Sequence, residues 1–379
     1  MIWTLLKLLF SKGLSIKRWN NFPRVEDITP LDNSGFVIHV ALFMAHLEEE
    51  NGEKIDKEYI IKKIIFDLFK SLVLSDINSW TRDYLLKIDK KIMQKLEDKV
   101  LNYLYSFEGW DFIKKDMQEI FSDDSKTLED DIIFAAKKFA GHQECVVNAR
   151  VFSYAYDVAL DEINTYFDEN KKKLHSLKEI LKNEKYRTYL SHIRRLSHAM
   201  RWSWKQRKYD ISVMAHLVIV IFLSYILANL ENKKDWNYDI LEIMLQSAYH
   251  DIPEAITWDI ITPIKNSVEG FREALEKVEE KMMDDYFFLY VPKEYKQEIS
   301  GYMLDPFSNK SWRLAKHADI FSALFEARIE RDAWSKEFND IYRDIKYGVN
   351  KFDTYSSNFI LKDVLLSFGD DILDITLDN

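Results

Sequence analysis

The chain has 379 residues, enough for one large domain or two domains of ordinary size. Its formal net charge of −10 argues against a general affinity for nucleic acid, which depends on many Lys and Arg side chains facing phosphates. The single cysteine, Cys145, excludes an intrachain disulfide and a zinc site built from several cysteines. No cleavable signal pattern with a small-residue end occurs, so we expect a cytoplasmic protein.

The residue pattern predicts an all-α fold. Glycine and proline, which punctuate strands and tight turns, number 9 and 6. Apolar residues recur at intervals of three and four, as they do on the buried face of a helix. This periodicity covers residues 55–74, 84–105, 128–167, 237–250, 268–290 and 311–346.

Two apolar stretches imitate membrane segments. The first is "MIWTLLKLLF" at the start of the chain, and the second is "HLVIVIFLSYILANL" at 216–230. Both are shorter than the ~20 residues that span a bilayer. We therefore expect no membrane partner, a core-docked first helix, and a central core helix at 216–230.

The chain divides near a charged run at 167–190, which predicts an exposed connecting helix between domains at 1–166 and 191–379. The two halves share an order of features: an Arg-Trp pair, a His near an apolar helix, and an Asp after the next helix. In the first half these are Arg18-Trp19, His39 and Ser75-Asp76, and in the second they are Arg201-Trp202, His216 and His250-Asp251. Residues 140–150 also overlay 318–328 without a gap. Duplication and chance similarity between helical sequences both remain open.

The second half contains four residues suited to a metal site, namely His216, His250, Asp251 and Asp319. Imidazole and carboxylate groups from several helices can converge on one ion. Adjacent residues of a regular helix point about 100° apart, so His250 and Asp251 can share an ion only where the helix breaks. Pro253 supplies that break. Taken singly, a His such as His216 is more often a hydrogen-bonded core residue than a ligand, and an Asp such as Asp319 is more often solvated or paired.

Three segments in order resemble one known family. They are "MRWSWKQRKYDISVMAH" (200–216), "HDIPEAITWDIITPIK" (250–265) and "LAKHADIFSALFEA" (314–327). The chain is similar here to the HD-domain metal-dependent phosphohydrolases, and within them to the bacterial 5′-deoxynucleotidases, over roughly residues 194–335. The resemblance implies tandem HD-type helical domains, the second with an intact metal-site motif.

The resemblance also implies roles for individual residues. One divalent ion (Mn, Co, Mg, Ni or Zn) would be held by His216, His250, Asp251 and Asp319. Glu254 would orient or deprotonate the attacking water, with Asp259 also on the substrate side. Phosphate would be held by Arg201, Trp202 would pack where a ribose 2′-hydroxyl would otherwise fit, and Lys265 would contact phosphate or sugar.

The first half is expected to be a metal-free, degenerate copy. In the overlay Ser75 stands in place of the doublet's His, and Gly141 stands opposite Asp319. Too few donors then remain for a tight divalent site. Such a half predicts either a monomeric pseudo-dimer or a homodimer, although binding of a regulatory nucleotide or a partner protein is an alternative.

The leading hypothesis is a metal-dependent phosphohydrolase of small nucleotides, with a deoxyribonucleoside 5′-monophosphate as substrate. A second hypothesis keeps the site and changes the substrate to a nucleoside triphosphate or a phosphodiester. A third is a non-catalytic nucleotide-sensing or scaffold protein.

Overall fold

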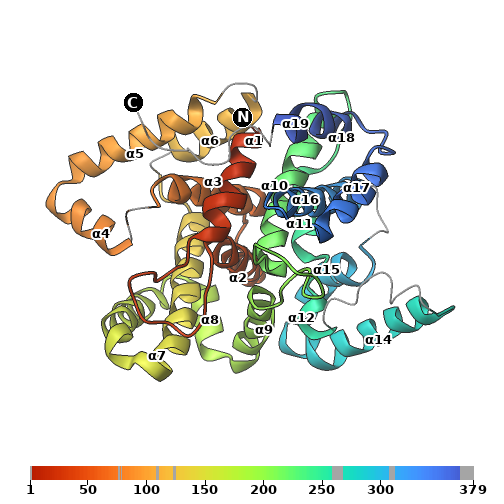
Figure 1. Ribbon diagram of the computed structural model, residues 1–379. Helices are drawn as coiled ribbons and strands as arrows, with labels where there is room; N and C mark the ends of the chain where they lie inside the picture. The colour runs from red at the N-terminus through yellow and green to blue at the C-terminus, as the bar shows by residue number, and fades with distance from the viewer. Residues whose placement is uncertain are drawn as a thin grey trace.

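The computed structural model describes residues 2–75, 77, 79–107, 111–122, 125–257, 268–306 and 312–367. Nearly every element in these ranges is helical, and the β pairing they contain is one isolated bridge between Met200 and Ser212. The expected all-α fold class is therefore confirmed. Figure 1 shows the first half of the chain on the left and the second half on the right, with α2 and α10 meeting between them.

The helices of the first half follow the predicted periodicity. They are α1 (Ile2–Leu8), α2 (Pro30–Glu50), α3 (Lys57–Val73), α4 (Ser79–Ile88), α5 (Lys90–Tyr105), α6 (Asp111–Ser122) and α7 (Leu128–Asn170). A capping box at Thr29 and Asp32 begins α2, because each residue satisfies a backbone or side-chain donor of the other. The predicted segment at 84–105 is two helices, since Asp89 caps the second of them.

The second half has the same helical character. Its helices are α10 (Val213–Asn232), α11 (Ile240–Tyr249), α12 (Glu254–Thr257), α14 (Phe271–Tyr286), α15 (Lys293–Leu304), α16 (Trp312–Asp332), α17 (Glu337–Val349), α18 (Tyr355–Phe359) and α19 (Leu365–Ser367). Short 3-10 or π-helical turns lie at Leu9–Gly13, Arg195–Ser197, Phe288–Tyr290 and Ile360–Val364.

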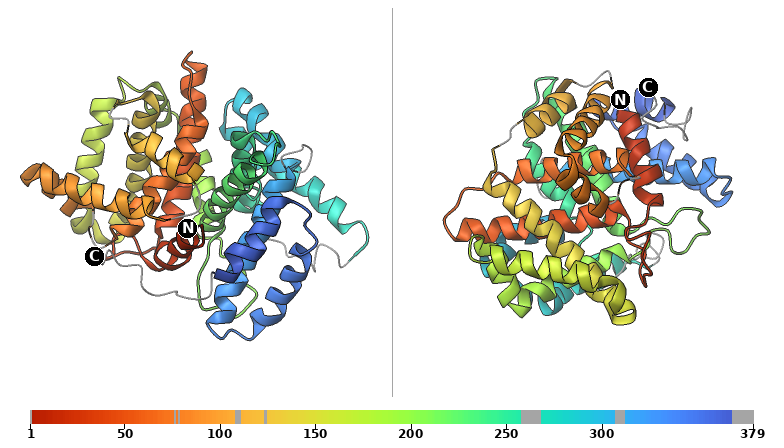
Figure 2. Two further views of the ribbon diagram at one scale, coloured as in Figure 1. Left: turned by 90° about the horizontal axis from the view of Figure 1, so that it is seen from above. Right: turned by 90° about the vertical axis from the view of Figure 1, so that its left-hand side faces the viewer.

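The connection between the halves differs from the prediction of one exposed helix at 167–190. The chain forms α8 (His175–Lys182) and α9 (Glu184–Arg194) there. Both helices bury apolar side chains, among them Leu177, Ile180 and Leu190. The charged residues of this run lie on the outer faces, and the interspersed leucines and isoleucines join the core. Figure 2 shows the segment packed along the body of the molecule.

The two apolar stretches are core helices, as predicted. Most of α1 is buried, including Leu5 and Leu6. Among the described residues, α10 is the helix long and apolar enough to cross a membrane, and 94% of the relevant stretch is buried inside the protein. A helix that is apolar on all sides and covered by other helices is typical of a protein core.

The helices α2 and α10 approach closely at Gly35. A Cβ atom at this position would lie 2.7 Å from Met214 Sδ and 3.0 Å from Val218 Cγ2. Asp32 of α2 also accepts a hydrogen bond from Ser212, the N-cap residue of α10. This contact fixes the start of α10 against the first half, and His216 lies one turn further along α10.

Candidate metal centre

The first candidate ligand, His216, is fully buried near the start of α10. Its Nδ1 lies 2.8 Å from Glu326 Oε1 and 3.0 Å from Ser322 Oγ. Because Glu326 is a hydrogen-bond acceptor, it fixes the imidazole proton on Nδ1. The opposite nitrogen, Nε2, lies 3.2 Å from Asp319 Oδ1 and 3.7 Å from Asp251 Oδ2.

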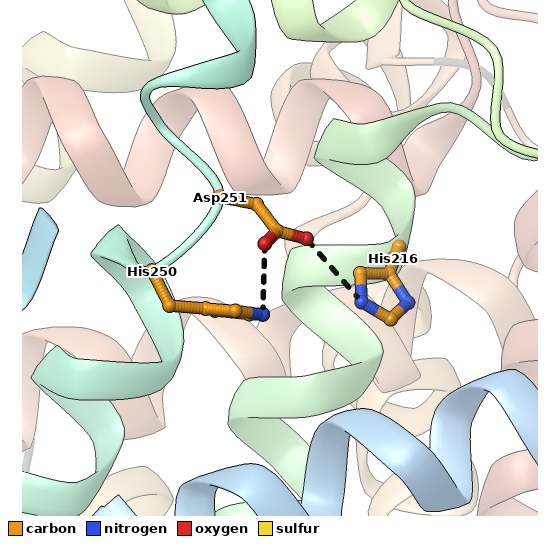
Figure 3. A group of neighbouring side chains, drawn as sticks. All are labelled: His216, His250 and Asp251. Carbon is orange, nitrogen blue, oxygen red and sulfur yellow. Dashed lines mark ion pairs between the residues drawn. The ribbon is translucent and has the colours of Figure 1, made fainter. Parts of the chain in front are cut away.

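The His250-Asp251 pair lies where α11 ends, as the sequence predicted. The backbone leaves the helix at His250 and turns through Pro253 before α12 begins. The Nδ1 of His250 lies 2.9 Å from the Ser247 carbonyl, so it is the donor nitrogen. Its Nε2 faces Asp251 Oδ1 at 3.3 Å. Figure 3 shows both side chains pointing toward His216.

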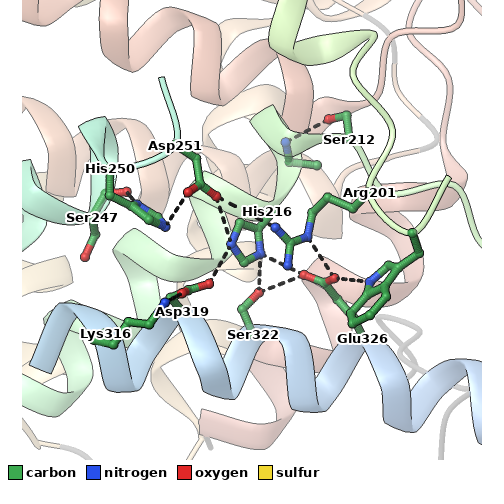
Figure 4. Close-up of polar contacts among 12 residues, drawn as sticks. Arg201, Ser212, His216, Ser247, His250, Asp251, Lys316, Asp319, Ser322 and Glu326 are labelled. Carbon is green, nitrogen blue, oxygen red and sulfur yellow. Dashed lines mark hydrogen bonds and ion pairs between the residues drawn. The ribbon is translucent and has the colours of Figure 1, made fainter. Parts of the chain in front are cut away.

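The fourth candidate, Asp319, comes from α16. One of its oxygens faces His216, and the other accepts a bond of 2.6 Å from Lys316 Nζ. Lys316 is three residues earlier on the same helix, so the two side chains lie on one face. The four predicted ligands therefore converge from three helices, as Figure 4 shows.

The chemistry of these side chains fits a divalent ion. The Nε2 atoms of His216 and His250 are buried, and neither has a hydrogen-bond partner among the residues that the structure describes. A buried polar atom without a partner destabilises a protein by about 1–3 kcal/mol unless something else satisfies it. Ligand atoms of His216, His250 and Asp251 also lie within 4.8 Å of one another. Two imidazoles with carboxylates form a donor set that suits several transition metals.

Sequence reasoning missed Glu326, which holds three parts of the site together. Besides His216, its carboxylate accepts bonds from Arg201 Nε at 3.1 Å and from Trp202 Nε1 at 2.7 Å. Glu326 lies seven residues after Asp319, two helical turns on the same face of α16. That spacing was the available signal, but it does not reveal which distant side chains a buried carboxylate will meet.

Arg201 and Trp202 lie in the loop before α10. The guanidinium of Arg201 lies between Glu326 and Asp251, whose Oδ2 is 3.8 Å from one of its terminal nitrogens. Trp202 has a left-handed backbone, with φ of 57°, and its ring packs against Phe338. The predicted phosphate contact of Arg201 and the predicted sugar contact of Trp202 remain predictions.

The other predicted substrate-side residues differ in how far they can be located. Glu254 is the first residue of α12, three positions after Asp251. Burial lowers the pKa of Arg201, but the surrounding carboxylates, Glu254 among them, outweigh it and raise this pKa above its usual value. Asp259 and Lys265 lie outside the described residues. A small pocket beside the site is lined by residues from the end of α11 and from α16, including His250, Asp319 and Lys316. Lys316 is a cation that sequence reasoning did not select.

The charges of the site are strongly coupled. Burial raises the pKa of Glu326, but Arg201 and His216 outweigh it and hold this pKa well below the usual range. Burial likewise raises the pKa of Asp319, and Lys316 is the main group that brings it far below its usual value. Both carboxylates are therefore ionised, as metal ligation and its supporting hydrogen bonds require.

A second group of potential ligands is already occupied by a lysine. His46, Glu49 and Glu298 place ligand atoms close together where α2 meets α15. Lys57 Nζ lies 2.7 Å from Glu49 and 2.6 Å from Glu298. Its ammonium satisfies both carboxylates, so this cluster is an ion-pair network between the two halves.

Comparison with known proteins shows that the candidate site lies in the part of the chain that has known relatives. Residues 188–368 match the family model described as 5′-deoxynucleotidase YfbR-like. The C-terminal half is similar to YfbR-like 5′-deoxynucleotidases. This match includes all four candidate ligands.

Individual relatives cover the same part of the chain. A 5′-deoxynucleotidase of Pasteurella multocida is 26% identical over 187 residues, which is 48% of this chain and 94% of the relative. One from Vibrio atlanticus is 23% identical, with coverage of 48% and 93%. A 5′-deoxynucleotidase of Yersinia pestis is 29% identical over 40% of this chain and 77% of its own length. An HD-domain phosphohydrolase structure from Listeria innocua aligns with a TM-score of 0.44 at 20% identity, covering 48% of this chain and 88% of that one.

Proposed function

We propose that the C-terminal half is a divalent-metal-dependent phosphohydrolase that removes phosphate from a deoxyribonucleoside 5′-monophosphate. The observation that carries the proposal is the convergence of two buried imidazole Nε2 atoms, which have no hydrogen-bond partner among the described residues, with the carboxylates of Asp251 and Asp319. The match of this segment to 5′-deoxynucleotidases supports the choice of substrate.

His216, His250, Asp251 and Asp319 would hold the ion. When bound, a divalent ion lowers the pKa of water and withdraws charge from a phosphoryl oxygen. Glu326 keeps the His216 proton on Nδ1 and so keeps Nε2 available, while the Ser247 carbonyl does the same for His250. These two acceptors set the tautomers on which the site depends.

The remaining charged groups suit the substrate side. Arg201 carries a permanent positive charge next to Asp251, and a guanidinium can donate two parallel hydrogen bonds to phosphate oxygens. Its Nε is already bonded to Glu326, which leaves the terminal nitrogens to face the phosphate. Lys316 adds a second cation on the opposite side of Asp319. Both cations favour the dianionic substrate.

The reaction is a single displacement at phosphorus. A water oxygen forms the new P–O bond, and the bond from phosphorus to the nucleoside 5′-oxygen breaks. Glu254 accepts the proton of the attacking water, and that proton then passes to the departing 5′-oxygen. The products are inorganic phosphate and a deoxynucleoside, with no covalent bond between enzyme and substrate.

The experiment is a phosphate-release assay with the full chain. Purified protein is incubated with deoxyribonucleoside and ribonucleoside 5′-monophosphates, triphosphates and a diester, each with Mn, Co, Mg, Ni or Zn. Metal-dependent phosphate release from the deoxy monophosphates is expected, and it should be abolished by Asp251→Ala. Asp168→Ala, at an exposed position of α7, is the matched control and should retain full activity.

The products separate the alternatives. Release of pyrophosphate or triphosphate, or of a nucleotide from the diester, would replace the monophosphate proposal with the second hypothesis. If no substrate yields phosphate with any of the metals, the enzymatic proposal fails. A nucleotide that binds without being consumed would then favour a sensing role.

A further inference from the structure

Two stretches that begin 183 positions apart make the same backbone contacts. Arg18 N donates to the Ile28 carbonyl at 2.8 Å, and Arg201 N donates to the Ile211 carbonyl at 2.9 Å, where 201 − 18 = 183 and 211 − 28 = 183. The tryptophan that follows each arginine is left-handed, with φ of 55° in one half and 57° in the other. Left-handed backbone is uncommon for a bulky side chain, so its recurrence at matched positions indicates a repeated loop.

The carboxylate that receives each Arg-Trp pair also recurs. Glu144 accepts a bond of 3.0 Å from Arg18 Nε and one of 2.8 Å from Trp19 Nε1. Glu326 accepts the corresponding bonds in the second half, at 3.1 and 2.7 Å. The two glutamates are 326 − 144 = 182 positions apart, so α7 and α16 are equivalent with this offset.

Contacts further along the chain keep the same register. Residue pairs 183 apart cap the equivalent helices α2 and α10, and α3 and α11. These N-cap pairs are Thr29 with Ser212 and Asp56 with Asp239. Glu48 and Glu231, also 183 apart, accept backbone N–H groups at the starts of α8 and α18 at 2.7 and 2.6 Å.

This register identifies the first-half counterparts of the candidate ligands. Subtracting 183 from 216, 250 and 251, and 182 from 319, gives positions 33, 67, 68 and 137. These positions hold Asn33, Asp67, Leu68 and Lys137. The sequence overlay, which chose His39, Ser75-Asp76 and Gly141, therefore had the wrong register.

We infer that the first half is a second copy of the helical unit in which the ammonium of Lys137 takes the place of the metal ion. Lys137 Nζ lies 2.5 Å from Asp67 Oδ2, joining α7 to α3. In the second half the corresponding helices, α16 and α11, contribute Asp319 and His250. The cation is thus part of the polypeptide in one copy and is taken from solution in the other.

The charges of the first-half position favour the lysine over an ion. Burial raises the pKa of Asp67, but Lys137, Lys70 and Lys63 outweigh it and lower the pKa below its usual value. Asp67 is therefore an ionised carboxylate surrounded by ammonium groups. A divalent ion would be repelled by those groups, and Leu68 offers it no ligand atom.

Metal stoichiometry provides the first test, and it is independent of phosphatase activity. The full chain should bind one divalent ion, and Asp251→Ala should bind none. A second ion that persists in Asp251→Ala and disappears on Asp67→Asn would overturn the inference.

A double-mutant cycle provides the second test. Lys137→Met and Asp67→Asn should each lower Tm by about 1–2 °C, because the pair is partly exposed and such pairs contribute about 0–1 kcal/mol. The double variant should be no less stable than either single variant, because each single change leaves one charge without its partner. Lys138→Met is the matched control, since this neighbour lies over the Phe134 ring and should matter less. A Tm for Lys137→Met equal to that of the unchanged chain would refute the inference that the Lys137 ammonium takes the place of the metal ion.

Discussion

Glu326 Oε1 lies 2.8 Å from His216 Nδ1, on the side of the ring opposite the candidate metal position. Either side chain alone would destabilise the core, because a buried carboxylate and a buried imidazole each need a hydrogen-bond partner. Together they fix Nδ1 of His216 as a hydrogen-bond donor and leave its Nε2 available to a metal ion.

Glu326→Gln should therefore weaken metal binding by about 10–100-fold, the usual effect of losing the acceptor behind a metal-binding histidine. The amide keeps the shape of the side chain but removes the negative charge that favours the Nδ1 proton. Metal affinity is measured by calorimetry. Glu144→Gln is the control, since it alters the same contacts with Arg18 and Trp19 in the first half. Equal losses in both variants would contradict the assigned role.

Removing the metal should lower thermal stability. An ion that binds only the folded chain stabilises it by about 2.7 kcal/mol when present at 100 times its dissociation constant. Tm should therefore rise with added metal and fall with a chelator, as followed by circular dichroism. In Asp251→Ala the response should disappear, and a response of unchanged size would show that the ion binds elsewhere.

His39 should make stability fall as the pH is lowered. It is fully buried, neither ring nitrogen has a hydrogen-bond partner among the described residues, and burial lowers its pKa to about 3. Between pH 6.5 and about 3 the unfolded chain binds a proton at this residue and the folded chain does not. The folded state thus loses about 1.4 kcal/mol per pH unit through this range as the pH falls.

His39→Phe should remove that contribution. Urea unfolding at several pH values, with a chelator present, should give a shallower dependence below pH 6.5 than the unchanged chain. Stability at pH 7 should be equal or higher, because two buried nitrogens without partners are removed. Identical pH slopes for the two proteins would show that His39 is protonated in the folded state.

Gly35→Val should destabilise the contact between the halves. The first added carbon already lies within 3.0 Å of three atoms of Met214 and Val218, and such overpacking costs about 1–3 kcal/mol. The loss is measured by urea unfolding. Gly348→Ala is the control, because nothing lies within 4 Å of its added Cβ. A Gly35 variant as stable as the Gly348 variant would mean that α10 shifts freely.

The sequence was sufficient to predict the helices and to select four side chains that the structure brings together. His216, the 250–251 pair and Asp319 each lie at a position that their local pattern had suggested, namely a helix start, a helix end broken by Pro253, and one face of a helix. Such patterns involve only residues that are close in sequence, so they can be interpreted without knowledge of the fold.

The contacts behind the ligands could not be predicted in this way. Glu326 meets Arg201 across 125 positions, and nothing in either local pattern specifies the other. The register predicted for the two halves was wrong for a related reason. A helix shifted by four residues presents nearly the same apolar face, so the overlay of 140–150 on 318–328 resembled the true match while lying one turn away from it.

The close approach of Gly35 to Val218 has a genetic consequence. The two positions are equivalent in the 183-residue register, so each side of the contact faces its own counterpart. In a homodimer one codon would specify both sides, and a residue there would have to fit against itself. Here two codons specify them, and one side can shrink to glycine while the other keeps a branched side chain.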